Sequence, residues 1–208
     1  RNYLDEKIAS NPEPVYGVTT GFGSLCNVSV SKDQLTQLQI NLIKSHACGT
    51  GERVPNDIVK IMLLLKIQSL SYGYSGCKLD TVQRLVDFFN NGVYPIVYRQ
   101  GSLGASGDLV PLAHLCLPLV GLGEVEYEGT LISGEEMLRR KNWTPIELAS
   151  KEGLALLNGT QNMSSFAVWA LLQAYRLSDW ADRIASMSLD AYDGRIEPFK
   201  DSWKLQHA

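Results

Sequence analysis

The stretch Gly101-Ser-Leu-Gly-Ala-Ser-Gly-Asp108 places three glycines and two serines directly before a strongly apolar segment. A phosphate-binding P-loop needs a Lys-Ser or Lys-Thr pair after its last glycine, whereas Asp108 follows Gly107 here. The nucleophile elbow of a hydrolase, G-x-S-x-G, needs a glycine at its fifth position, which Asp108 occupies. Both interpretations therefore fail on Asp108, whereas a plain flexible loop stays open.

The triplet Ala105-Ser106-Gly107 allows a further interpretation, in which the backbone reacts with itself. In a tight bend the Gly107 nitrogen can attack the Ala105 carbonyl, because small residues leave room for the approach, and the carbonyl oxygen then leaves as water. The Ser106 hydroxyl can leave as a second water, which gives a five-membered ring with an electrophilic, dehydroalanine-like methylidene. Apolar residues from Leu109 onward predict a helix beginning near Asp108, and a helix N-terminus stabilises negative charge. Asp108 itself either assists the cyclisation or caps that helix.

Composition narrows the class of protein. The 208 residues are 45% hydrophobic and carry a net charge of −3, without a basic run, so neither nucleic acid nor an anionic membrane is expected as a partner. No apolar run is long enough to cross a bilayer. The four cysteines are scattered without a C-x-x-C pair, which predicts reduced thiols in a cytoplasmic protein rather than a zinc site or a disulfide framework. Both chain ends look cut, so we expect a longer protein.

Apolar residues at helical spacing predict a mainly α fold. We expect helices over residues 31–46, 55–72, 80–91, 108–118, 133–141 and 161–189. Ser133 is expected to cap the helix that follows it, and Glu128-Gly129 predicts a small β-hairpin within residues 125–132. The last helix carries an apolar stripe that cannot be buried within this chain, which predicts a long-helix bundle.

Two further side chains are candidates for chemistry, although residue type alone leaves them open. Tyr16 lies in the glycine-rich stretch 15–23, where a tyrosine more often packs than catalyses. His46 continues the apolar face of the first predicted helix at its C-terminal end, where a histidine usually serves as a structural or capping residue.

Four motifs follow one another along the chain: Tyr16-Gly-Val-Thr-Thr-Gly-Phe-Gly23, Ser45-His-Ala-Cys-Gly49, Gly101-Ser-Leu-Gly-Ala-Ser-Gly-Asp-Leu109 with Pro111-Leu-Ala-His114, and Lys151-Glu-Gly-Leu-Ala-Leu-Leu-Asn-Gly-Thr-Gln161. Taken together and in this order, they resemble those of the aromatic amino acid ammonia-lyases. The pair Ser45-His46 is similar to the histidine-specific branch of that family rather than to the His-Leu or Phe-Leu pairs of tyrosine and phenylalanine lyases.

The resemblance implies a carbon–nitrogen lyase that eliminates ammonia from L-histidine to give trans-urocanate. Its prosthetic group would be 4-methylideneimidazole-5-one (MIO), formed from Ala105, Ser106 and Gly107, with no external cofactor and no metal ion. Tyr16 would be the base that removes the substrate β-proton. His46 and Asn158 would bind the substrate and act in catalysis, with Asn158 beside the prosthetic group.

The resemblance also implies an L-aspartase/fumarase-like architecture and a homotetramer with shared active sites. Residues 1–150 would form the MIO-bearing N-terminal domain, and residues 151–208 the truncated start of the central helical bundle. The family's second half, with further substrate-binding and catalytic residues, has no counterpart in this chain. The alternatives are a tyrosine or phenylalanine ammonia-lyase, an aminomutase of the same fold, or an inactive fragment in which the ring never forms.

Overall fold

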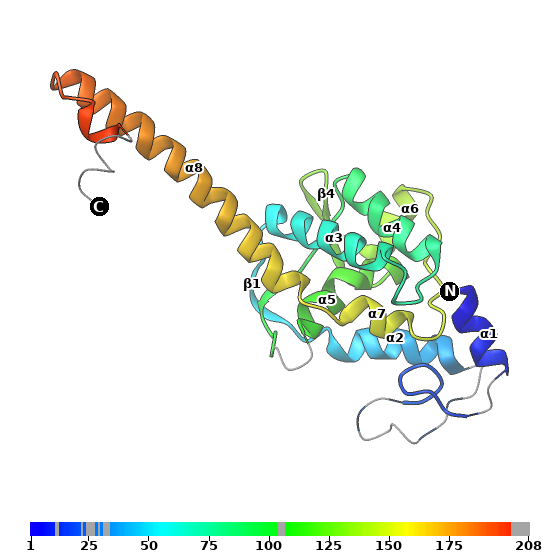
Figure 1. The fold of residues 1–208 in the computed structure, drawn as a ribbon. Coiled ribbons are helices and arrows are strands. Elements are labelled where there is room, and N and C mark those ends of the chain that lie inside the picture. Colours follow the sequence, from blue (N-terminus) through cyan, green and yellow to red (C-terminus); the bar gives the residue numbers. More distant parts are fainter. Residues whose placement is uncertain are drawn as a thin grey trace. The chain divides into compact units, whose positions relative to one another are not determined.

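The computed structural model describes residues 1–10, 13–21, 23, 28, 30, 34–103 and 107–200. Helices dominate this part of the chain, as the sequence predicts (Figure 1). The elements follow in the order α1 (Asn2–Ser10), α2 (Leu35–His46), β1 (Thr50–Arg53), α3 (Asn56–Ser71), α4 (Leu79–Asn90), β2 (Tyr94–Pro95), β3 (Tyr98–Gln100), α5 (Leu109–Cys116), the 3₁₀ helix η3 (Leu117–Val120), β4 (Glu124–Tyr127), β5 (Thr130–Ser133), α6 (Gly134–Arg140), α7 (Glu152–Leu157), α8 (Gln161–Ala191) and the 3₁₀ helix η4 (Glu197–Phe199).

The chain falls into two compact units, Arg1–Phe166 and Ala167–Ala208. The hydrophobic core belongs to the first unit, where α2, α5 and α7 contact one another and α3 packs on α4 (Figure 1). Its apolar side chains come from helices far apart in sequence, for example Ile43 of α2, Leu112 of α5 and Leu156 of α7, all completely buried. The predicted domain boundary after residue 150 concerns the complete protein and stays a prediction.

Local chemistry explains two of the short elements. Strands β4 and β5 form the predicted antiparallel hairpin, and its turn residues Glu128 and Gly129 have φ values of 52° and 71°. Such left-handed backbone is the geometry of a two-residue hairpin turn, which glycine adopts without a steric penalty. The predicted cap is also confirmed, because the Ser133 hydroxyl oxygen accepts a hydrogen bond from the Glu136 amide at 3.1 Å, at the start of α6.

A second antiparallel pair, which the sequence pattern does not predict, joins β1 to β3. Thr50 lies opposite Gln100 and Arg53 opposite Tyr98. All four residues of β1 are exposed, so no hydrophobic alternation marks this strand in the sequence. The pairing brings the segment that follows α2 beside the segment that precedes the glycine-rich stretch.

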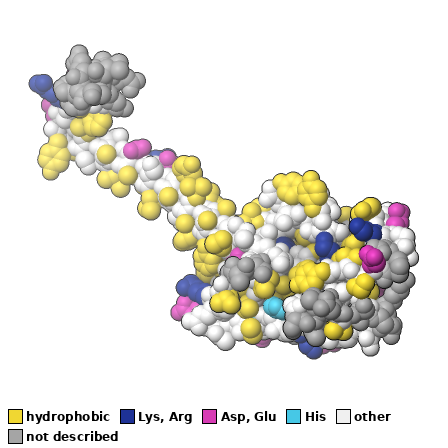
Figure 2. All heavy atoms as spheres, turned by 60° about the horizontal axis from the view of Figure 1, so that its bottom comes forward, with side chains coloured by type: hydrophobic (Ala, Val, Ile, Leu, Met, Phe, Trp, Pro, Cys, Tyr) yellow, Lys and Arg dark blue, Asp and Glu magenta, His cyan; other side chains and the backbone are white. Residues whose placement is uncertain are grey.

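The long predicted helix is present as α8, with 31 residues. Its apolar stripe is largely exposed, with Leu177 at 70% and Ile184 at 59%, and Figure 2 shows hydrophobic side chains spaced along this helix. No helix among the described residues combines the length and the apolar character that crossing a membrane requires.

Candidate active site

Gly107, the last residue of the triplet, packs directly against the turn that follows α7. Its φ is +109°, and a Cβ added to it would lie 2.3 Å from the carbonyl oxygen of Gly159. Both the backbone conformation and the contact exclude a side chain at this position. Gly104, Ala105 and Ser106 lie outside the described residues. Within the triplet, the structure therefore describes only the packing of Gly107.

Asp108 connects three segments at this point. Its amide donates to the Gly159 carbonyl at 2.7 Å, and its two carboxylate oxygens accept from the Ser102 hydroxyl and from the Met163 amide, both at 2.9 Å. Although Asp108 stands at the N-cap position of α5, its side chain makes no capping bond on that helix. The capping alternative from the sequence is therefore wrong for α5, because the carboxylate caps the first turn of α8 instead.

Asn158 directly follows α7, as its C-cap residue, and begins the turn against which Gly107 packs. The Asn158 carbonyl oxygen accepts a hydrogen bond from the ammonium of Lys66 at 3.0 Å. Asn158 as a whole is nevertheless exposed at the surface of the chain. The next residue, Gly159, has a φ of +148°, which non-glycine residues rarely adopt. The turn thus holds the Asn158 peptide between α3 on one side and the start of α5 on the other.

His46 is the last residue of α2, as the sequence predicts, and is half-buried. Its Nδ1 lies 2.8 Å from the Leu42 carbonyl oxygen and 3.1 Å from the Ser45 hydroxyl oxygen. A carbonyl only accepts hydrogen bonds, so Nδ1 must carry the proton. In the neutral ring, Nε2 then presents its lone pair.

The loop after His46 meets the glycine-rich stretch through two close contacts. The Gly49 amide donates to Nε2 of His114 at 2.9 Å, and a Cβ on Gly101 would lie 3.2 Å from the Gly49 Cα and 2.6 Å from a methyl carbon of Val110. Burial lowers the pKa of His114, which keeps its ring neutral and able to accept this bond. The sequence alone gave no signal for this role of His114, although His114 is part of the Pro111-Leu-Ala-His114 motif.

Tyr16 lies in a loop and is 59% exposed. Its hydroxyl oxygen accepts from the Gly23 amide at 3.4 Å, and the Ser150 hydroxyl donates to the carbonyl of Val18 in the same loop. Tyr16 lines a cavity of about 420 Å³ together with the cations Arg1, Lys7 and Lys151, and with Tyr3 and Tyr74 among others. Neither His46 nor Asn158 is among the described residues of that lining, so the structure brings Tyr16 into a different neighbourhood from theirs.

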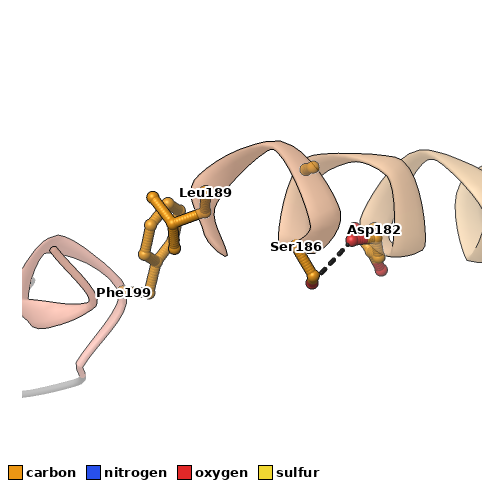
Figure 3. Close-up of a pocket in the computed structure, with 5 residues that line it drawn as sticks. Asp182, Ser186, Leu189 and Phe199 are labelled. Atoms are coloured by element: carbon orange, nitrogen blue, oxygen red, sulfur yellow. Dashed lines mark hydrogen bonds between the residues drawn. The ribbon is translucent and has the colours of Figure 1, made fainter. Parts of the chain in front are cut away.

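A smaller cavity of about 270 Å³ lies within the unit Ala167–Ala208, beside the C-terminal part of α8 (Figure 3). Leu189 and Phe199 form its apolar lining, and the Ser186 hydroxyl donates to the backbone carbonyl of Asp182 at 2.8 Å. This is a hydrogen bond within α8, to the carbonyl four residues earlier in the same helix. Among the described lining residues, the Ser186 hydroxyl is therefore not activated as a nucleophile.

The described part of the chain shows no cluster of metal ligands, and two of its three thiols are held in the protonated form. It contains no group of three His, Cys, Asp or Glu side chains that could hold a metal ion. Burial raises the pKa of Cys116 to about 12 and that of Cys77 to about 11, so both thiols stay protonated and unreactive near neutral pH.

Comparison with known proteins places these motifs in one family. The family model described as aromatic amino acid lyase matches residues 1–206. A histidine ammonia-lyase of Legionella pneumophila (strain Lens) is 51% identical over 201 residues, which are 97% of this chain and 39% of the relative. One from Streptococcus pyogenes serotype M49 is 46% identical over 202 residues, again 97% of this chain and 39% of the relative. The chain thus spans about two fifths of the length of these curated relatives.

Solved structures agree on the fold. The histidine ammonia-lyase from Trypanosoma cruzi superposes with a TM-score of 0.84 at 36% identity, covering 93% of this chain and 38% of that one. The phenylalanine aminomutase of Pantoea agglomerans superposes with a TM-score of 0.88 at 32% identity, covering 98% of this chain and 39% of that one. The family model, the sequence identities and the fold agree, and the chain belongs to the aromatic amino acid lyase family.

Proposed function

We propose that this chain is the N-terminal part of a histidine ammonia-lyase, which eliminates ammonia from L-histidine and releases trans-urocanate. The observation that carries the proposal is the packing of Gly107 and Asp108 against Gly159, in a chain about half identical to histidine ammonia-lyases. This contact joins the triplet motif to the Asn158 motif, two of the four stretches that carry the family resemblance.

The residues fit a prosthetic group made from Ala105, Ser106 and Gly107. The carbonyl of Gly159 leaves no room for a side chain at Gly107, and the bond from the Asp108 amide to that carbonyl fixes the chain immediately after the triplet. Because its own residue carries no side chain and the following amide is fixed by a hydrogen bond, the Gly107 nitrogen is suited to attack a neighbouring carbonyl. When formed, the MIO group supplies an electrophilic carbon that ordinary side chains lack.

The remaining roles follow from the geometry of each side chain. His46, whose Nδ1–H is bound to the Leu42 carbonyl, presents Nε2 as an acceptor for a donor group of the substrate. Asn158 presents an exposed amide from a turn that is anchored on both sides. Tyr16, which lines a cavity together with Arg1, Lys7 and Lys151, removes the β-proton of the substrate.

The assembly and its location are part of the proposal. Tyr16 lies in a different neighbourhood from His46 and Asn158, and α8 carries exposed apolar side chains. Both features support a homotetramer in which subunits share residues of each active site. The three described cysteines are free, as is usual in the reducing cytoplasm, where we place the enzyme.

The test is the reaction of the full-length protein with L-histidine, followed by the ultraviolet absorbance of urocanate. Wild-type protein should produce urocanate and ammonia, and Ser106→Ala should produce neither, because the residue can no longer lose its hydroxyl as water. An intact mass lower by two water molecules in the wild type only would show that the ring has formed.

The same assay separates the alternatives. The similarity to the Pantoea agglomerans phenylalanine aminomutase makes an aminomutase the second candidate. A β-amino acid product would decide for it, and conversion of tyrosine or phenylalanine without histidine would reject the histidine assignment. An unmodified mass with no turnover would identify a non-catalytic chain.

A further inference from the structure

Lys66 is a buried cation that the proposed mechanism does not use. It lies on α3 with only 1% of its surface exposed and is among the largest fully buried side chains. Within the described residues it forms no ion pair, and its ammonium donates to the carbonyl oxygen of Asn158 at 3.0 Å. Burial lowers the pKa of Lys66 to about 8.

Folding stability alone does not account for a lysine at this position. Burial of an ammonium group without a carboxylate partner is costly, and replacing buried charge by an apolar side chain of similar size is often neutral or stabilising. A methionine would fill much the same volume. The explanation must therefore come from the atom to which Lys66 binds.

That atom belongs to the turn that touches the triplet. Lys66 holds the carbonyl of Asn158, and the carbonyl of the next residue, Gly159, accepts from the Asp108 amide and abuts Gly107. Two successive peptide groups are thus anchored, one to α3 and one to the start of α5. Since Gly159 has a φ of +148°, its own flexibility would allow the turn to move if one anchor were lost.

We propose that Lys66 is a positioning residue, whose buried ammonium holds the Asn158–Gly159 turn against Gly107 and Asp108. In this way it fixes both the direction of the Asn158 side chain and the backbone beside the triplet. The consequence for turnover rests on the proposed function. The consequence for the turn does not, because it follows from the hydrogen bonds alone.

The first measurement is hydrogen–deuterium exchange in the full-length protein, comparing wild type with Lys66→Met and Lys60→Met. Lys60 is an exposed lysine on the same helix, with its ammonium 5.3 Å from the Phe89 ring, so it controls for the loss of a charge on α3. In Lys66→Met the Asp108 amide should exchange at least about tenfold faster, because a hydrogen bond to a charged donor no longer secures the turn. Lys60→Met should leave it unchanged.

Two further readouts distinguish positioning from general stabilisation. Lys66→Met should melt no lower than the wild type, yet show a kcat reduced at least about tenfold with little change in KM, and a smaller fraction of chains lighter by two water molecules. Lys66→Arg keeps a charged donor and should exchange at Asp108 more slowly than Lys66→Met.

The outcomes are separable. Unchanged exchange at Asp108 in Lys66→Met overturns the inference, as does a variant that fails to fold or that exchanges faster throughout residues 1–166, since Lys66 would then support the fold as a whole. A wild-type protein that releases no ammonia from any aromatic amino acid rejects the proposed function instead, and the exchange measurement still decides the role of Lys66.

Discussion

Gly107 has less space around its Cα than one methyl group needs, because the carbonyl of Gly159 lies against it. The same carbonyl binds the Asp108 amide, so a shift of the turn that relieved the clash would also weaken that bond. Gly129 offers a matched comparison. It also has a positive φ, of +71°, but nothing lies within 4 Å of a Cβ built there.

We therefore expect Gly107→Ala to be far more harmful than Gly129→Ala. Both variants incur the backbone cost of a left-handed alanine, about 1 kcal/mol, but only Gly107→Ala also forces an overlap, which should add about 2 kcal/mol. Urea unfolding gives the two stabilities, and ammonia release gives the activity, which should fall at least about a hundredfold in Gly107→Ala. Equal effects of the two substitutions would contradict the packing described here.

Lys66 should make stability depend on pH in a specific direction. Below pH 8 the lysine is charged in both the folded and the unfolded chain, so the full cost of its burial applies. Between pH 8 and about 10.5 the folded lysine is neutral while the unfolded one still binds a proton, so the free energy of unfolding rises with pH. Across this whole pH range, the lowered pKa of Lys66 raises the free energy of unfolding by about 3 kcal/mol, at about 1.4 kcal/mol for each pKa unit.

The measurement is the difference in unfolding free energy between wild type and Lys66→Met at pH 7 and pH 10. From pH 7 to pH 10 this difference should change by about 2 kcal/mol in favour of the wild type, since pH 10 lies near the upper end of the range between the two pKa values of Lys66. Groups that do not interact with Lys66 titrate alike in both proteins and cancel in the difference. A difference that stays constant over this range would mean that Lys66 keeps an ordinary pKa.

The first turn of α8 is stabilised by Asp108, the residue that directly precedes α5. The carboxylate of Asp108 accepts from the Met163 amide, which belongs to the third residue of α8. An anionic acceptor in the first turn satisfies a free amide and interacts favourably with the helix dipole. The helix that begins where the Asn158 motif ends is thereby joined to the residue that follows the triplet.

Asp108→Ala should consequently loosen α8 at its beginning rather than α5. We expect a loss of about 1–2 kcal/mol and faster amide exchange at Met163 and its neighbours. Ser133→Ala serves as the control, because it removes an equivalent cap from α6 and should loosen only that helix, at about 1 kcal/mol. Faster exchange in the first turn of α5, with α8 unaffected, would refute the assignment.

The exposed apolar side chains of α8 indicate that another chain packs against this helix in the complete protein. Leu177 and Ile184 lie seven residues apart on one side of the helix, and both are exposed. A stripe of this kind is a usual signature of helix packing between chains. It supports the proposed homotetramer.

Leu177→Glu in the full-length protein should lower the molar mass measured by light scattering and reduce activity together with assembly, because it would place a charge among apolar partners. Asp179→Arg changes the charge two residues further along, on the opposite side of the same helix, and should leave the assembly intact. If both variants remain tetrameric, the stripe is not the assembly surface.

The sequence determined the features that depend on neighbouring residues. Helical periodicity predicted the mainly α fold, the turn at Glu128-Gly129 predicted the hairpin, and the four ordered motifs identified the family. The roles of Tyr16, His46, Ser106 and Asn158 stay predictions. They rest on the resemblance, and Ser106 lies outside the described residues.

Only the tertiary structure decided how these motifs meet. The bond from Lys66 to Asn158 spans 92 residues of sequence, and the bond from Met163 to Asp108 spans 55. Spacing along the chain carries no signal for such contacts, because each depends on how the intervening helices pack. The same packing explains why Asp108 caps α8 rather than α5, and why a buried lysine lies under the turn that holds Gly107.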